Sequence, residues 1–174
     1  IVIANERRYF APVNVEEYYP LEDSDDIENK THVVFGWLLN QSVDLKERMR
    51  VELMSNILLD HSASPLRKAL ETSDLGTAPS PLCGMDDSSK EINFMCGLEG
   101  CKADQAKAVE DMIFSTLDKV VNEGVAQDQV DAALHQLEIA QREISGDGYP
   151  YGLQLILAGL TPAIHYGDPI ALIN

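Results

Sequence analysis

His135 and Glu138 lie in the segment of this sequence that comes nearest to a hydrolytic metal site. In the motif His-x-x-Glu-His, two histidines four residues apart bind zinc and the glutamate between them acts as general base. Residues 135–139 have the sequence HQLEI, so Ile139 takes the place of the second histidine. One imidazole and one carboxylate do not hold a catalytic zinc ion without further ligands. We therefore interpret His135 as a surface or partly buried histidine of a helix.

His61 raises the same question, because it lies at the break between two expected helices in LLDHSASPLRKALETSDLG (58–76). Ligand pairs on a helix stand three or four residues apart, where their side chains share a face. Around His61 those positions hold poor zinc ligands, namely Ile57, Leu58, Ser64 and Pro65. Asp60 is adjacent in sequence and points elsewhere on a helix. We predict that His61 belongs to a structural joint.

The remaining candidate chemistry is weaker. Cys96 and Cys101 form C-x4-C with no second pair, and with Cys83 they make an odd count, which favours buried or loop thiols in a reducing compartment. No G-x-S-x-G is present, and GDGYPYG (146–152) follows a helix, whereas a dinucleotide loop follows a strand. We predict no catalytic residue, no metal ligand and no cofactor in this chain.

Composition limits the classes of partner. The chain has 174 residues with 29 acidic and 13 basic side chains, giving a net charge of −16. This charge argues against nucleic acid or an anionic membrane as the main partner. The most apolar stretch, residues 153–160, is too short to span a bilayer. The chain begins at Ile1 and ends where a helix has hardly begun, so we expect a piece of a longer polypeptide.

Two regions are expected from the patterning. Residues 1–29 form an extended linker arm, in which VNVEEYYP (13–20) can be a strand and the acidic residues 22–30 a solvated linker. Residues 30–174 form one domain, beginning with a buried strand over 31–40 in which Gly36 suggests a close backbone approach or a bulge. A helix over 44–60 follows, with Leu45, Met49, Leu53 and Ile57 as its apolar row and Met54 and Leu58 on the adjoining row.

The rest of the domain alternates between turns and regular elements. Ser64 and Pro65 begin a short helix that runs to Asp74, and residues 82–85 have possible strand character. Residues 91–100 alternate cleanly, which is typical of an antiparallel strand with one covered face. Helices are predicted from Asp104 to about 121 and over 130–144. SGDGYPYG (145–152) then breaks the chain, and a last helix runs from there to about 160. The order predicts an α+β two-layer sandwich, with an antiparallel sheet and helices packed on one face.

Four ordered segments together resemble the pitrilysin/insulinase type of zinc metallopeptidase, and within it the presequence-protease branch. They are KTHVVFGWLL (30–39), LLDHSASPLRKALETSDLG (58–76), INFMCGLEG (92–100) and ALHQLEIAQREISGDGYPYGLQLI (133–156). The resemblance extends over about residues 8 to 174. In that family four homologous α+β domains form two halves that close around a peptide, and the first carries His-x-x-Glu-His. This chain resembles the non-catalytic second domain, although the family usually has glycine at the position of His61.

The resemblance implies a non-catalytic domain of a zinc-dependent endopeptidase that degrades short unstructured peptides. The domain would form part of a chamber wall and support the catalytic domain, which would hold the zinc ion. Its partners would be the catalytic and C-terminal domains of its own polypeptide and peptide substrates, with no nucleic acid and no membrane. An intracellular location follows, either bacterial cytoplasm or organelle matrix.

Two other functions are considered. Some relatives of this fold are scaffold subunits of assemblies and have no peptidase activity. A polypeptide that lacked His-x-x-Glu-His throughout would belong to that class, so the sequence upstream of Ile1 separates the two. The third alternative, that the chain is itself a hydrolase, has little support in the residues described above.

Overall fold

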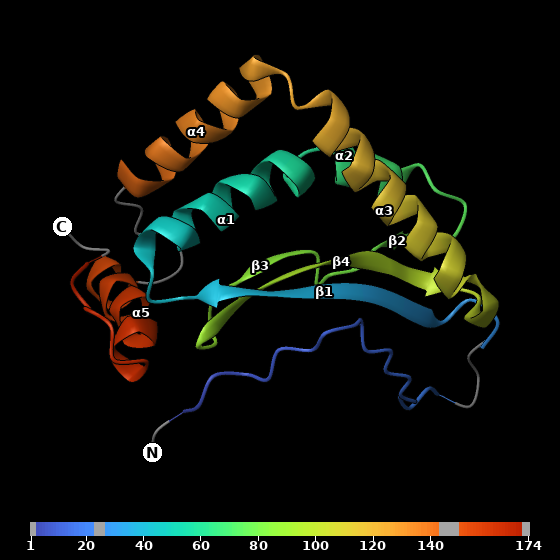
Figure 1. The fold of residues 1–174 in the computed structure, drawn as a ribbon, viewed down its shortest axis with the longest axis horizontal. Coiled ribbons are helices and arrows are strands. Elements are labelled where there is room, and N and C mark those ends of the chain that lie inside the picture. Colours follow the sequence, from blue (N-terminus) through green and yellow to red (C-terminus); the bar gives the residue numbers. More distant parts are fainter. Residues whose placement is uncertain (1–2, 23–26, 143–149, 172–174) are drawn as a thin grey trace.

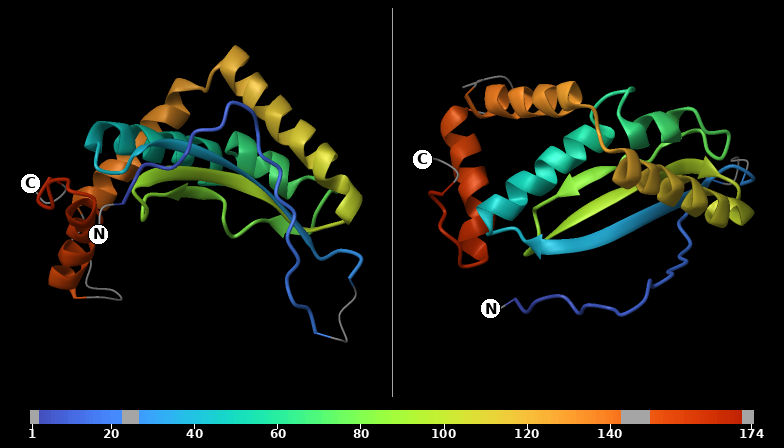
Figure 2. Two further views of the ribbon diagram at one scale, coloured as in Figure 1. Left: turned by 60° about the horizontal axis from the view of Figure 1, so that its bottom comes forward. Right: turned by 45° about the horizontal axis from the view of Figure 1, so that its top comes forward.

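The computed structural model describes residues 3–22, 27–142 and 150–171 of the chain. Figure 1 shows a layer of helices above a β-sheet, with an extended arm on the opposite side. The sheet is antiparallel and its core side faces the helices, which confirms the predicted α+β two-layer class. The two further views in Figure 2 show the same layering and the curvature of the long strands.

The sheet is built around β4 (Glu91–Cys101). β1 (Thr31–Gln41) pairs with one side of β4, while the short strands β2 (Ala78–Pro79) and β3 (Gly84–Asp86) pair with the other. The predicted alternation in β4 is confirmed, because its helix-facing side chains are at most 4% exposed: Ile92, Phe94, Cys96 and Leu98. The predicted strand over 31–40 is also confirmed, although only its alternate side chains pack against the core.

The close backbone approach predicted at Gly36 lies instead on the neighbouring strand. A Cβ atom at Gly36 would meet nothing nearer than Met95 Cγ at 3.6 Å, and the register around Gly36 is regular. A Cβ atom at Gly97 would lie 2.7 Å from Val34 Cα, so this position admits no side chain. The prediction for Gly36 was therefore wrong: the side chain of Met95, and not a backbone, lies in front of this glycine.

The helix α1 (Leu45–Leu59) begins as predicted, with Asp44 Oδ1 accepting a hydrogen bond from the Glu47 N–H at 3.2 Å. Its buried face is different from the predicted row, because Met49 is exposed and the buried side chains are Val51, Ser55, Leu58 and Leu59. The reason is that α1 lies between the sheet and α4 (Gln127–Arg142), so apolar residues occur on more than one side of it.

The second helix, α2 (Pro65–Glu71), has proline in its first turn as expected, but it ends earlier than the predicted Asp74. A short 3-10 turn, η1 (Ala103–Gln105), precedes α3 (Ala106–Glu123), which ends at Gly124 with a φ of 76°. The last helix, α5 (Tyr151–Ile164), continues past Thr161 and contains Pro162, where the sequence predicted a stop. Pro162 lacks the N–H that would donate to the carbonyl of Ala158, so the helix continues there with one hydrogen bond fewer.

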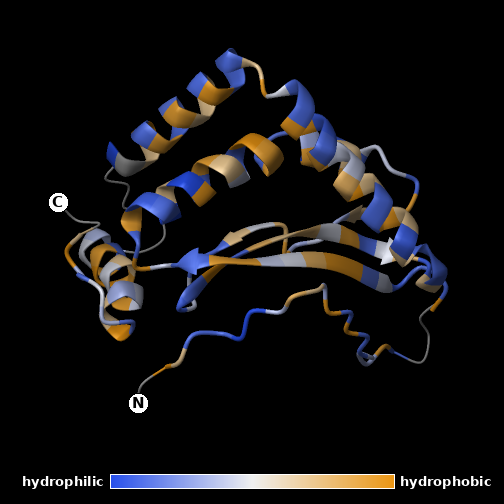
Figure 3. Cartoon of the chain, in the orientation of Figure 1, coloured by the Kyte–Doolittle hydropathy of each residue, from blue (hydrophilic) through white to orange (hydrophobic). Residues whose placement is uncertain are grey.

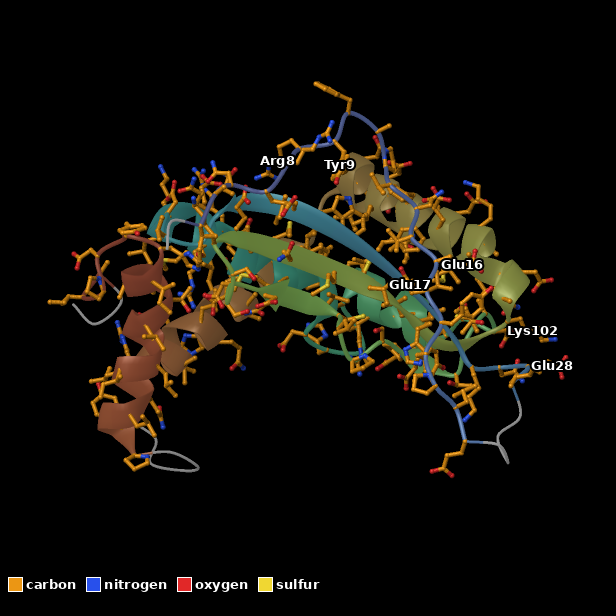
Figure 4. All side chains as sticks on the ribbon, turned by 90° about the horizontal axis from the view of Figure 1, so that it is seen from below. Arg8, Tyr9, Glu16, Glu17, Glu28 and Lys102 are labelled. Carbon is orange, nitrogen blue, oxygen red and sulfur yellow. The ribbon has the colours of Figure 1, made fainter. Side chains whose placement is uncertain are left out.

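The N-terminal arm runs on the β1 side of the sheet, away from the helices (Figure 4). The segment VNVEEYYP forms no strand, so that prediction was wrong: polar groups of residues 13–20 find no partner strand in the described chain. The arm is held near its start by Arg8 and near its end by Tyr19, whose ring packs edge-on against His32 at 5.5 Å.

Candidate functional site

His61 lies in the turn between α1 and α2, where its exposed ring stabilises the local backbone. Its Nδ1 atom accepts a hydrogen bond from the Ala63 N–H at 3.2 Å, and its carbonyl accepts one from the Ser64 N–H at 2.8 Å. Among the described residues other than glycine, only Tyr166 has a positive φ, so this turn needs no left-handed backbone at His61. His61 therefore stabilises the turn between the two helices through a hydrogen bond to its own side chain.

His135 lies on the exposed side of α4. Its Nδ1 atom is 3.9 Å from Glu138 Oε2, and the two side chains are 71% and 51% exposed. Glu138 is also paired with Arg142 one turn further along the helix, so its carboxylate already has a cationic partner. The pair is an ordinary helix-surface contact between residues three apart. His135 and Glu138 thus resemble the His-x-x-Glu-His motif only in their spacing along the sequence.

The three cysteines are free thiols and lie in or beside the core. Burial raises the pKa of Cys96 to about 12, with a smaller contribution from the neighbouring Cys83. Burial also raises the pKa of Cys83, whose sulfur accepts a hydrogen bond from the Gly97 N–H at 3.4 Å. Burial likewise raises the pKa of Cys101. Because the thiolate is the nucleophile and the metal ligand, these protonated thiols are poor candidates for either role.

The polar site that the sequence analysis missed joins the arm to the end of the sheet. Arg8 Nη2 lies 2.9 Å from Glu91 Oε1, and the Arg8 guanidinium donates to the carbonyl oxygens of Leu38 and Leu39. The Glu6 N–H donates to the second carboxylate oxygen of Glu91 at 2.7 Å. We refer to these contacts of Glu6 and Arg8 with Leu38, Leu39 and Glu91 as the arm latch.

The arm latch forms where the pairing of β1 with β4 is irregular. The register shifts between Leu38 and Gln41, which is typical of a β-bulge. Arg8 donates to the Leu38 and Leu39 carbonyls beside this shift and at the same time neutralises Glu91, which is only 6% exposed. No sequence spacing could reveal this pair, because the two residues are 83 positions apart. The only sign of the pair in the sequence was an acidic residue, Glu91, at the start of a strand expected to be covered.

The described residues do not offer a site for zinc. In the ranges 3–22, 27–142 and 150–171, no three His, Cys, Asp or Glu side chains are grouped closely enough to hold a metal ion. The expectation that the chain as a whole binds no metal stays a prediction. Nor does any helix in these ranges have the length and apolar character needed to cross a membrane.

Comparison with known proteins gives three concordant results. Presequence protease 1, chloroplastic/mitochondrial, of Arabidopsis thaliana is 32% identical over 165 residues, covering 94% of this chain and 15% of the relative. The mitochondrial presequence protease of Xenopus tropicalis is 31% identical over 151 residues, covering 87% and 14%. A proposed zinc protease from Bordetella pertussis Tohama I has a similar fold, with a TM-score of 0.56, 17% identity, and coverage of 82% of this chain and 81% of that chain.

The class of protein follows from the fold: this is an α+β domain that shares its fold with a zinc protease, and its described residues bring no three metal-ligating side chains together. Residues 5–137 match the family described as peptidase M16 inactive domain, and the chain belongs to that family. The predicted resemblance to this family and to its presequence-protease branch is thereby confirmed. The chain spans about 15% of the length of the presequence proteases that it matches.

Proposed function

We propose that this chain is the non-catalytic domain of a zinc-dependent endopeptidase that degrades short unstructured peptides. The observation that carries the proposal is the match of residues 5–137 to an inactive peptidase domain, together with 32% identity to a presequence protease. The zinc ion belongs in another domain of the same polypeptide. The names of the matched relatives favour an organelle matrix over a bacterial cytoplasm as the location.

The domain forms part of the wall of the substrate chamber and supports the catalytic domain. The sheet supports this proposal, because its helix-free face presents side chains from the two long strands that stay partly exposed although the arm lies on the same side, among them Val34, Leu38, Met95 and Glu99. The helices occupy the opposite face (Figure 1). A partly apolar sheet face without helices is suited to contact extended peptides that have no fold of their own.

The net charge of −16 supports a further refinement, that the enclosing protein prefers basic peptides. Acidic side chains attract cationic substrates over a range set by the Debye length, so the preference should weaken as salt is added. Equal affinity and equal salt response for a basic and an acidic peptide of the same length would contradict this refinement.

The testing experiment measures peptide cleavage by the longer polypeptide with and without this domain. We expect cleavage that stops on zinc chelation in the intact protein and is strongly reduced without residues 1–174. A mutation of His-x-x-Glu-His upstream provides the matched control. The alternative, a scaffold subunit of the same fold, predicts that this motif is missing and that no peptide is cleaved with or without the domain.

A further inference from the structure

The helix α5 is apolar on two opposite sides. It contains no Asp, Glu, Lys or Arg in YGLQLILAGLTPAI, although 24% of the chain is charged. At about 100° per residue, one side carries Leu155, Gly159 and Pro162, of which the last two are buried. The opposite side is exposed by 39% to 66% and consists of Leu153, Ile156, Leu160 and Ile164. We refer to these four residues as the α5 stripe.

The α5 helix makes only a small contact with the rest of the domain. It lies across the end of the helix layer, beside the start of α1 (Figures 1 and 2), and Figure 3 shows apolar residues along it. A cavity of about 130 Å³ remains at this contact, bordered on the α5 side by Leu157, Ala158, Thr161 and Pro162 and on the other side by Ser42, Arg48 and Asp87. A helix that is apolar all round is stable in water only when both sides are covered.

The position of α5 in the chain indicates what covers it. The match to the inactive-domain family ends at residue 137, before α5 begins. The alignment with the Arabidopsis presequence protease nevertheless covers 94% of the chain, so it extends through α5. The α5 residues are therefore aligned with residues of the relative, and 85% of the relative's length lies outside the aligned part, since the chain covers 15% of it.

We propose that the α5 stripe is a docking surface for a neighbouring domain of the same polypeptide, whose contacting surface is apolar. This proposal rests on the proposed function in one respect, that the chain is part of a multidomain protein. A second copy of the chain is a less suitable occupant, because each copy has a net charge of −16. A membrane surface is less suitable as well, because α5 has no Lys or Arg with which to meet lipid headgroups.

The test uses thiol labelling at single positions. Ile156→Cys and, as a second stripe position, Leu160→Cys are compared with the control Val121→Cys, which is 82% exposed on α3. Each variant is prepared as the 174-residue chain and within the longer polypeptide, and the rate of maleimide labelling is measured. We expect both stripe positions to react about tenfold or more slowly in the longer polypeptide, and Val121→Cys to react equally in both.

Equal labelling of the stripe in the two forms would overturn the proposal. Protection in the 174-residue chain that grows with its concentration would assign the stripe to self-association. Protection on adding vesicles of phosphatidylcholine and phosphatidylglycerol would assign it to a membrane surface. Because labelling does not depend on peptide cleavage, protection in a polypeptide without peptidase activity would contradict the proposed function and leave the docking surface standing.

Discussion

Arg8 and Glu91 form an ion pair of 2.9 Å that ties the N-terminal arm to the strand at the centre of the sheet. Glu91 is almost fully buried, whereas Arg8 is half exposed, so the carboxylate depends on the arm for its neutralisation. A buried carboxylate that loses its cationic partner is destabilising, although the exposure of Arg8 reduces the loss. The arm is thus a structural part of the sheet end rather than a free linker.

Replacing Arg8 should release the start of the arm. For Arg8→Ala we expect the Glu6 amide, which donates to Glu91, to lose its protection from hydrogen exchange, and the free energy of unfolding to fall by about 1–2 kcal/mol. Arg7→Ala is the matched control, because the Arg7 side chain packs over Tyr9 on the arm itself. Unchanged protection of Glu6 in Arg8→Ala would contradict the arm latch.

The two strand glycines should respond differently to the same substitution. In Gly97→Ala the added methyl group would meet the backbone of Val33 and Val34 in the neighbouring strand, so the strands must separate. We expect a loss of about 3 kcal/mol or more in urea unfolding. Gly36→Ala places its methyl group 3.6 Å from Met95 Cγ, an ordinary contact, and should cost less than about 1 kcal/mol. Similar losses in both variants would refute this explanation.

Stability should decrease in alkaline solution because of the buried thiols. The pKa of Cys96 is raised from 9.0 to about 12 in the folded chain, so above pH 9 the unfolded chain releases a proton that the folded chain keeps. The stabilisation is complete below pH 9 and is lost as the pH rises towards 12, by at most about 1.4 kcal/mol per pH unit.

In Cys96→Ala the free energy of unfolding should fall less steeply with pH, because one proton fewer is released on unfolding. The measurement is urea unfolding between pH 8 and pH 10.5 with a reductant present. Burial raises the pKa of Cys83 and Cys101 too, so part of the slope should remain in the variant. A slope identical to that of the wild-type chain would show that Cys96 is ionised as easily in the folded state as in the unfolded one.

The 174-residue chain should not bind zinc stoichiometrically. His61 is engaged in its own turn and His135 stands on an exposed helix surface, each without converging ligands among the described residues. Equilibrium dialysis with elemental analysis should find well below one zinc ion per chain at micromolar metal, and His135→Ala should give the same result. One tightly bound ion per chain that is lost in His135→Ala or His61→Ala would contradict this prediction. It would favour the alternative that the chain is itself a metal-dependent hydrolase.

Periodicity predicted the regular elements well, since it reports which side of an element is covered. The alternation in residues 91–100 identified β4 and its buried face, and the Ser64-Pro65 pair identified the start of α2. The apolar row of α1 was misplaced, because a helix with neighbours on two sides has no single apolar face. Residues 143–144 of the helix predicted over 130–144, and residues 145–149 after it, lie outside the described residues.

Contacts between distant segments could not be predicted from local patterns. The arm latch depends on a bulge in β1, and bulges follow from the pairing of two strands rather than from the sequence of one. The resemblance to a metallopeptidase family predicted the fold and the lack of the zinc motif, but it was silent on how Arg8 and Glu91 meet. The sequence likewise did not show which side of α5 is exposed, because that depends on which residues pack against the helix.

The outer edge of β1 has a consequence for how the domain behaves on its own. Within the described residues β1 pairs with a strand on one side only, and the arm runs beside its other side without forming a strand, in contact with it at Arg8 and Tyr19. Open strand edges are templates for pairing with further chains. Cutting the chain just before Thr31 would remove the arm from this edge. The shortened protein should then be prone to pair edge to edge with further copies and to form insoluble aggregates.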